Sequence, residues 1–392
     1  MQSSRSRGPL RPETRTDLFY LSFFTIAGVM TAYGGLWFAH MGLSEAQISL
    51  ISAAPILVML MLNIAVGRIA DRASDWRQVI IWGAMIGGLS GIGLIWAQGV
   101  WSIGLVILLV SATQIGTMPV LDAATIRMTR RRGSSYGPRR AWGTVGYILA
   151  LVLTGVLADR YGPAVFVPLF VGIGLLRAAT SLLLPRFRAP EDPRDPVPVQ
   201  SLRAVLKPWF VLPLLGAALV FGSHLILNTF QSLLLVRQGI SETTVSLLIA
   251  LGAVAETVLF FTFARFSHLL AARQFLLIAA LVTVLRWVAF GFEPGVGPLI
   301  FLQALHAITF ALSLIAVVGF IANHTDEGIA AQAQSFYVML QQGASILALM
   351  VFGSLVGSWG AEAYFLSAGI AALGAACILA SLVLKPPREK SD

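Results

Sequence analysis

Charged residues and cysteines are both scarce in this chain of 392 residues. Asp, Glu, Lys and Arg together make up 11% of it, whereas an average soluble domain carries about 25%. This shortage excludes a water-soluble enzyme and a disordered protein, because both expose a charged surface. The single cysteine, Cys377, excludes an internal disulfide and a cysteine-based metal cage. We therefore expect no metal site.

Apolar sequence dominates the chain, since hydrophobic residues make up 57% of it and the mean hydropathy is +0.82. A helix needs about 20 consecutive apolar residues to span a bilayer. Twelve runs meet this requirement, at residues 17–40, 45–65, 78–97, 101–126, 141–159, 163–184, 209–236, 243–263, 274–292, 297–322, 330–355 and 361–384. The sequence therefore predicts an all-α integral membrane protein with twelve transmembrane helices.

The basic residues indicate which loops face the cytoplasm. The net charge is +9, from 27 Lys and Arg against 18 Asp and Glu. The basic residues lie in the two tails or in the loops after the second, fourth, sixth and eighth spans, except Arg160, Arg177, Arg237 and Arg286. Cytoplasmic loops carry such an excess, so both termini are expected in the cytoplasm. The surplus is thus a topology signal, and no nucleic acid is expected as a partner.

A hydrophilic, proline-rich stretch separates six spans from six spans and predicts a cytoplasmic linker. The predicted units are a six-helix bundle at 1–184, the linker at 185–208 and a second bundle at 209–392. Two motifs recur between the bundles. Gly42-Leu43-Ser44-Glu45 with Ser49 returns 197 residues later as Gly239-Ile240-Ser241-Glu242 with Ser246, and Ala150, Gly155 and Gly162 return 198 residues later as Ala348, Gly353 and Gly360. Such parallel repeats place a binding site near the midplane, between the halves.

Ser44 and Ser241 in the first motif are each expected to cap the helix that follows. The loop after the second span has a charge pattern of its own, in which Gly67, Arg68, Asp71 and Arg72 form a G-x-x-x-D-R core. A glycine permits a tight turn, and alternating acids and bases can form ion pairs that separate two gate conformations. The pattern resembles the loop signature of the major facilitator superfamily. Together with the twelve spans and the linker, it implies that superfamily's fold of two pseudo-symmetric six-helix bundles, with these four residues in a gating loop.

Three ionisable residues lie deep inside predicted spans of the second half, namely Glu256, Arg286 and His306. A charge at the centre of a membrane helix costs ~2.5–3.5 kcal/mol on insertion scales, so such residues suggest function. Counted along their helices, the three fall near the same depth, close to the middle of the bilayer. They can neutralise one another and exchange a proton. The alternative is a fixed Glu256–Arg286 ion pair that only orders the bundle.

Polar residues also form stripes on several spans. Residues three, four or seven apart share a helix face, and three such sets are His224, Asn228 and Gln231; Gln334, Tyr337 and Gln341; and Gln114, Met118 and Asp122. Stripes on several helices favour a wet central cavity, although each could instead form hydrogen bonds between helices. Asp122 and Arg140 lie near the cytoplasmic ends of their spans, where an interfacial ion pair is an equally good interpretation.

Within the superfamily, the chain resembles the lactose permease and phenylpropionate permease group over nearly its whole length. Asp122, Arg140 and Tyr147 are similar in spacing to the acid, arginine and aromatic residue that bind sugar in lactose permease, and Glu256, Arg286 and His306 match its carboxylate, arginine and histidine. Segments such as Gly222-Ser223-His224 and Gln303-Ala304-Leu305-His306-Ala307 look closer to the phenylpropionate group. Thr309 departs from the pattern, because lactose permease has a proton-carrying carboxylate there. Gln303 replaces a basic residue.

These features and the resemblance predict a secondary active transporter of a bacterial inner membrane, not an enzyme, working by alternating access about a midplane site. The leading version imports a small organic acid of the phenylpropionate type by proton symport, with the proton gradient and no cofactor as the driving force. Glu256, Arg286 and His306 would couple the proton, Arg140 or Arg286 would meet the carboxylate, and Tyr147 would stack on the ring. The other predicted substrate contacts are Asp122, His224, Asn228, Gln231, Gln334, Tyr337 and Gln341.

The expected partners are a small-molecule substrate, a proton and the lipid bilayer, with a monomer as the functional unit. The same architecture could serve a sugar or nucleoside proton symporter, or a drug/proton antiporter. A lipid-modifying enzyme or a membrane receptor would be a different class. Against these, the loops show no nucleophile elbow and no clustered metal ligands, and no soluble domain is present to carry a signal.

Overall fold

The computed structural model describes residues 10–72, 75–187, 206–325 and 327–384, without the side chains of residues 63–72, 327, 328, 330 and 331. This part of the chain is nearly all helical. Its elements are α1 (Pro12–Val29), η1 (Met30–Gly34), α2 (Gly35–His40), α3 (Glu45–Arg72), α4 (Trp76–Ser90), η2 (Gly91–Ile95), α5 (Gly99–Arg132), α6 (Tyr136–Tyr161), η3 (Gly162–Val165), α7 (Phe166–Ser181), α9 (Pro208–Ile226), η4 (Leu227–Gln231), α10 (Ser232–Arg237), α11 (Glu242–Thr262), η5 (Phe263–Arg265), α12 (Ala272–Gly291), α13 (Val296–Ala304), η6 (Ala307–Leu312), α14 (Ser313–His324), α15 (Glu327–Trp359), η7 (Gly360–Ala363) and α16 (Tyr364–Val383). Of the η segments, η1, η4 and η6 are π-helical and the others are 3-10 turns.

Ten segments of the described chain are long and apolar enough to cross a membrane. Two of them hold two helices each. Tyr136–Ser181 contains α6 and α7 joined by η3, and Gln332–Val383 contains most of α15 joined to α16 by η7. Divided at these turns, the segments correspond in order to the twelve predicted spans. The prediction of an all-helical membrane fold is confirmed.

Helix ends differ from the predicted span ends on the side of the predicted cytoplasmic loops. The helix α3 continues to Arg72, so the backbone at Gly67, Arg68 and Asp71 is helical, and the prediction of a tight turn there is wrong. A run of apolar residues ends where the bilayer ends, whereas helical hydrogen bonds can continue into water. The side chains of these four predicted gating residues lie outside the described residues, and their gating role stays a prediction. The predicted linker also lies largely outside them, at 188–205.

The turns before α3 and α11 are built by the first repeated motif. Gly42 and Gly239 take φ values of 79° and 90°, which side-chain-bearing residues rarely adopt. Ser44 Oγ then accepts a hydrogen bond from the Gln47 amide at 3.4 Å, and Ser241 Oγ accepts one from the Thr244 amide at 3.3 Å. Both predicted N-caps are therefore confirmed.

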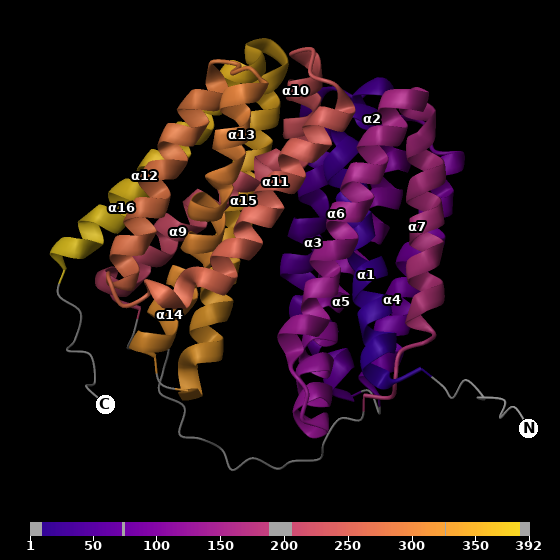
Figure 1. The fold of residues 1–392 in the computed structure, drawn as a ribbon, viewed down its shortest axis with the longest axis horizontal. Helices are drawn as coiled ribbons and strands as arrows, with labels where there is room; N and C mark the ends of the chain where they lie inside the picture. Colours follow the sequence, from indigo (N-terminus) through magenta and orange to yellow (C-terminus); the bar gives the residue numbers. More distant parts are fainter. Residues whose placement is uncertain (1–9, 73–74, 188–205, 326, 385–392) are drawn as a thin grey trace, which may run out of the picture.

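Figure 1 shows the helices in two groups, with α1 to α7 on one side and α9 to α16 on the other. The groups meet at the end that carries α2 and α10 and spread apart towards the opposite end. At the meeting end, Arg237 donates to Glu45 at 2.7 Å, and Thr243 donates to Asp159 at 2.8 Å. Among the described residues, the halves thus meet at this end, which we call the closed end.

The closest contacts at the closed end involve the repeated motifs. A Cβ added to Gly353 of α15 would lie 2.5 Å from Ser49 Cβ of α3, and one added to Gly155 of α6 would lie 2.5 Å from Ser246 Cβ of α11. Real Cβ atoms essentially never approach closer than 3.0 Å, so both positions require glycine. The serines belong to the first motif and the glycines to the second. Each motif of one half therefore contacts the other motif of the other half.

The buried core also joins the halves. Trp37 and Phe166 of the first half stack with ring centroids 4.7 Å apart, and Trp287 and Tyr364 of the second half stack at 5.7 Å. These rings belong to one continuous cluster of buried side chains. Aromatic side chains bury large apolar areas and therefore contribute much of the stability of a core. The shared core holds the space between the halves in a defined geometry.

Candidate functional site between the halves

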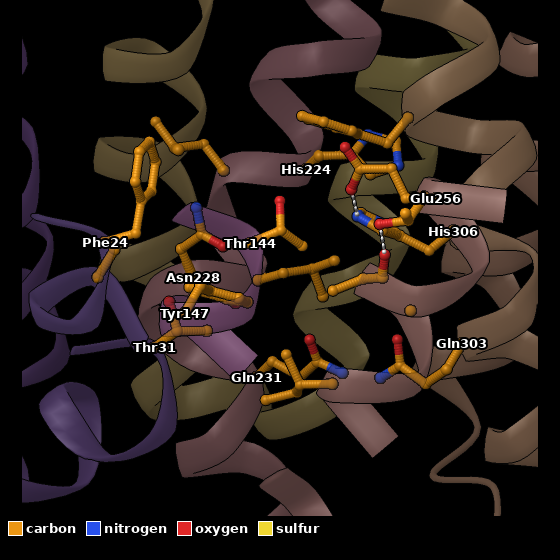
Figure 2. Close-up of a pocket in the computed structure, with 18 of the residues that line it drawn as sticks. Phe24, Thr31, Thr144, Tyr147, His224, Asn228, Gln231, Glu256, Gln303 and His306 are labelled. Atoms are coloured by element: carbon orange, nitrogen blue, oxygen red, sulfur yellow. Dashed lines mark hydrogen bonds and ion pairs between the residues drawn. The ribbon is translucent and has the colours of Figure 1, made fainter. Parts of the chain in front are cut away.

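A cavity of about 370 Å³ lies between the halves, within the usual size range of small-molecule sites. Figure 2 shows many of its side chains. The first half contributes α1, η1 and α6, and the second contributes α9, η4, α11, α13 and the turn around η6. The lining residues are Phe24, Ala27, Thr31, Arg140, Thr144, Tyr147, Phe221, His224, Leu225, Leu227, Asn228, Gln231, Ile249, Gly252, Ala253, Glu256, Thr257, Phe260, Gln303, His306 and Phe310.

Seven of the predicted site residues line this cavity, namely Arg140, Tyr147, His224, Asn228, Gln231, Glu256 and His306. The prediction of a polar cavity at the interface of the halves therefore agrees with the structure. Polar side chains and aromatic rings share its wall. Such a surface can hold a ligand that has both a polar group and an apolar body.

The first helix of each half supplies the same three positions to this wall. Phe24, Ala27 and Thr31 line the cavity from the first half, and Phe221, His224 and Asn228, each 197 residues later, line it from the second. Phe24 and Thr31 were not predicted. The repeat offset was the signal that could have found them, because it maps Asn228 onto Thr31.

A π-helical turn occurs at the equivalent place in both of these helices, η1 at 30–34 and η4 at 227–231. π-helical turns interrupt the α-helical hydrogen-bond pattern and are frequent at functional sites. The two turns contact each other, and Ser232 Oγ donates to the Thr31 carbonyl at 2.7 Å. This contact places Thr31, Asn228 and Gln231 around one region of the cavity (Figure 2).

Glu256 and His306 form the charged part of the wall. Glu256 Oε2 lies 3.7 Å from His306 Nε2, and the two side chains are 24% and 19% exposed. On the other side of the ring, His306 Nδ1 lies 3.3 Å from a terminal nitrogen of Arg286. A guanidinium can only donate, so Nδ1 accepts and a neutral ring carries its proton on Nε2, facing Glu256. The imidazole therefore sits between the acid and the arginine.

Arg286 itself does not line the cavity, because its side chain is 0% exposed. It donates to the Leu302 carbonyl at 2.8 Å and to Gln303 Oε1 at 3.1 Å, and it lies 3.4 Å from Thr309 Oγ1. No carboxylate among the described residues is within ion-pair distance of it. The alternative of a direct Glu256–Arg286 ion pair is therefore wrong, since His306 separates the two. Direct contact between Arg286 and a substrate is not possible in this conformation.

Asp122 and Arg140 are not paired with each other. Asp122 accepts a hydrogen bond from the Tyr20 hydroxyl at 2.6 Å and does not line the cavity. Arg140 does line it, with the guanidinium carbon 4.2 Å from the ring centroid of Phe24. The alternative of an interfacial ion pair is therefore wrong, since Asp122 makes a hydrogen bond within the first half and Arg140 makes a cation–π contact. Only the arginine is placed to meet a ligand.

The predicted stripe on α15 is also absent from the cavity wall. Gln334, Tyr337 and Gln341 do not line it, and Tyr337 is buried in a core cluster with Trp209 and Phe320. A polar stripe shows that a face meets other protein, but not which neighbour it meets. Within the described residues, no three His, Cys, Asp or Glu side chains come together as a metal site.

Comparisons with known proteins agree with this architecture. The profile described as the MFS_1 like family matches residues 14–366. A probable 3-phenylpropionic acid transporter of Escherichia coli strain K12 is 26% identical over 353 residues, covering 86% of this chain and 89% of that protein. A maltose permease of Geobacillus stearothermophilus is 24% identical over 388 residues, covering 98% and 97%.

Solved structures show the same fold. A mutant of the nucleoside transporter NupG superposes with a TM-score of 0.83 at 18% identity, covering 95% of this chain and all of that one. A bacterial homolog of the human lysosomal transporter Spinster, inward-facing and occupied, gives 0.78 at 17% identity, covering 97% and 98%. The family match spans most of the chain, and the relatives are permeases of one superfamily. The chain therefore belongs to the MFS_1 like family and is a multi-pass membrane transporter of the major facilitator superfamily.

Proposed function

We propose that the protein imports a small organic acid together with protons, by alternating access across a bacterial inner membrane. The observation that carries the proposal is the pair of Glu256 and His306 on the wall of the cavity between the halves. A carboxyl group and an imidazole at this separation can exchange a proton directly once a small side-chain movement brings them within hydrogen-bond distance. Both side chains are partly exposed, so protons can reach them from the cavity.

Arg286 determines which ring nitrogen of His306 carries the exchangeable proton. Its guanidinium occupies the Nδ1 side of His306, so the exchangeable proton of the neutral ring is confined to the Nε2 side. Glu256 on that side is the proton acceptor and donor that meets the cavity. Thr309 occupies the position at which lactose permease has a second carboxylate. Its side chain is 0% exposed and lies beside Arg286. Coupling therefore rests on Glu256, with His306 as its relay.

The cavity also suits an anion with an aromatic body. Arg140 brings a positive charge to the wall, and electrostatic attraction concentrates anions in such a site. Phe24, Tyr147, Phe221, Phe260 and Phe310 supply aromatic surface. The similarity to a probable 3-phenylpropionic acid transporter supports this substrate class. A monomer suffices, because one chain supplies both sides of the cavity.

A sugar proton symporter is the second candidate. It is favoured by the similarity to a maltose permease over nearly the whole of both chains. Against it, the acid expected to bind sugar hydroxyls, Asp122, is bonded to Tyr20 outside the cavity. The amides Asn228, Gln231 and Gln303 could still meet hydroxyl groups. Gradient-driven uptake of the two substrate classes, measured in parallel, decides between these candidates.

The test is uptake by proteoliposomes of labelled 3-phenylpropionate, with maltose and uridine in parallel, with and without an imposed pH gradient. We expect the wild type to accumulate 3-phenylpropionate only when the gradient is present. Glu256→Gln should abolish accumulation while exchange at equal concentrations continues, because the amide keeps the shape but carries no proton. Uphill uptake by Glu256→Gln, or gradient-driven uptake of maltose alone, would refute the proposal.

A further inference from the structure

Two buried amides on the cavity wall have donor groups without partners. Gln231 in η4 and Gln303 in α13 are each 2% exposed, and neither Nε2 atom has a hydrogen-bond partner within the described residues. Figure 2 shows their nitrogen ends pointing towards one another. Buried donors are normally satisfied, and an exception calls for an explanation. Both donors therefore need an acceptor that the described side chains do not supply in this conformation.

A hydrogen bond from Arg286 fixes the orientation of the Gln303 amide. Arg286 donates to Gln303 Oε1 at 3.1 Å, and a guanidinium can only donate, so the carbonyl end of the amide faces Arg286 and the NH₂ group faces away from it. Gln231, in contrast, makes no side-chain hydrogen bond to any described residue, so its amide can turn. One donor is therefore fixed and the other can adapt.

The charge at this place favours an anion over a neutral acceptor. Arg286 is fully buried, and its described partners are neutral groups. A buried cation without a counter-ion is costly. The Gln303 amide extends its positive field to the cavity, because hydrogen bonds in a chain polarise one another. An anion at the two amides would compensate Arg286 without touching it.

We infer that Gln231 and Gln303 bind the carboxylate of the transported acid, with each Nε2 donating to a carboxylate oxygen, and that Arg286 acts as a positioning residue through Gln303. Entry of the oxygen requires the two amides to part, which rotation of Gln231 allows. The aromatic body then extends from the amides towards Tyr147 and Thr31, which line the cavity from the first half. Arg140 attracts the anion to the cavity and does not hold it. This inference rests on the proposed function in that the substrate is an organic anion.

The test is equilibrium binding to the purified full-length protein in detergent, without any gradient. The probes are 3-phenylpropionate and its neutral analogue 3-phenylpropanol. The key variant is Gln303→Glu, which keeps an oxygen for Arg286 but replaces the cavity donor with a negative charge. We expect it to weaken 3-phenylpropionate binding by about 100-fold, since a charge-assisted hydrogen bond is lost and a repulsion is added. Binding of 3-phenylpropanol should change by less than about threefold.

Two further variants complete the design. Gln303→Met removes the donor without adding charge and should weaken 3-phenylpropionate binding by about tenfold. Gln98→Glu makes the same chemical change at an exposed position that does not line the cavity, and it should leave both affinities unchanged. If Gln303 only orders Arg286, Gln303→Glu strengthens that contact and preserves carboxylate binding, which would overturn the inference.

The unmodified protein supplies a measurement that does not depend on how the variants fold. We expect it to bind 3-phenylpropionate at least about tenfold more tightly than 3-phenylpropanol. Equal affinities, or no binding of 3-phenylpropionate, would overturn the inference. If the unmodified protein shows no gradient-driven uptake but its carboxylate binding depends on Gln303, only the proposed proton coupling is refuted. Normal uptake with binding independent of Gln303 would refute the amide site alone.

Discussion

Replacing both interface glycines should open the closed end. In Gly155→Leu with Gly353→Leu, each new Cβ would fall 2.5 Å from a serine Cβ and less than 3 Å from a helix carbonyl, of Glu242 and Glu45 respectively. Backbone atoms cannot move away cheaply. Overpacking of this kind costs about 1–3 kcal/mol per site, and the two sites share no partners, so their costs add. The closed conformation should lose about 2–6 kcal/mol relative to one in which this end is open.

The loss can be measured as access to the cavity from the closed end. In a Cys377→Ala background, Ala253→Cys places one thiol on the cavity wall. A membrane-impermeant maleimide added from the side of α2 and α10 should label it slowly in that background. The double leucine variant should be labelled at least about tenfold faster, since each 1.4 kcal/mol is a factor of ten in population, and gradient-driven uptake should fall.

The matched control substitutes two helical glycines that face open space. No atom lies within 4 Å of a Cβ added to Gly172 or Gly369, so Gly172→Leu with Gly369→Leu should leave the labelling rate unchanged. Leucine is also a better helix former than glycine. An unchanged rate in a folded Gly155→Leu, Gly353→Leu protein would refute the reasoning, as would equal acceleration in the control.

Two smaller perturbations follow from other contacts. Arg237→Gln removes the ion pair with Glu45, but the arginine side chain is 45% exposed, so the change should cost no more than about 1 kcal/mol; labelling at Ala253→Cys should rise by at most about fivefold, and a larger rise would show that this pair holds the end closed. The buried guanidinium of Arg177 donates to Gln114 Oε1. Gln114→Leu removes this acceptor and should lower the free energy of unfolding by about 3 kcal/mol. Adding Arg177→Met should restore most of the unfolding midpoint in detergent, and equal destabilisation of the single and double variants would count against this account.

Hydropathy was enough to predict the membrane-spanning segments and their order along the chain. It was not enough to place helix ends outside the bilayer. The predicted first span starts at residue 17, yet α1 starts at Pro12, because Glu13 and Asp17 form ion pairs with Arg132 and Arg139 at 2.5 and 3.0 Å. Charges that are paired across helices allow a helix to continue into water. A single sequence does not show that pairing.

The site was predictable where a polar residue had no other role in an apolar helix. Glu256, His306, His224 and Asn228 were found in this way. Asp122 was predicted as a substrate contact from the resemblance to lactose permease, but it lies outside the cavity, where Tyr20, distant in sequence, is its hydrogen-bond partner. The π-helical turns had no sequence signal of their own. A π-helical turn rotates the helix that follows it. The residues that share a face before and after the turn therefore cannot be assigned with one repeat of about 3.6 residues per turn.

The crossed contacts between the repeated motifs have the form of a twofold-symmetric dimer interface, in which residue i meets residue j of the partner and j meets i. An ancestral half-length chain could have made both contacts with a second copy of itself. In a single chain that carries both halves, the two contacts no longer need the same residues and can change independently. Arg237, which bridges to Glu45, has His40 at the equivalent place 197 residues earlier, and the second contact is closed by Thr243 and Asp159 instead. Each side of the gate can therefore be tuned by mutation without altering the other.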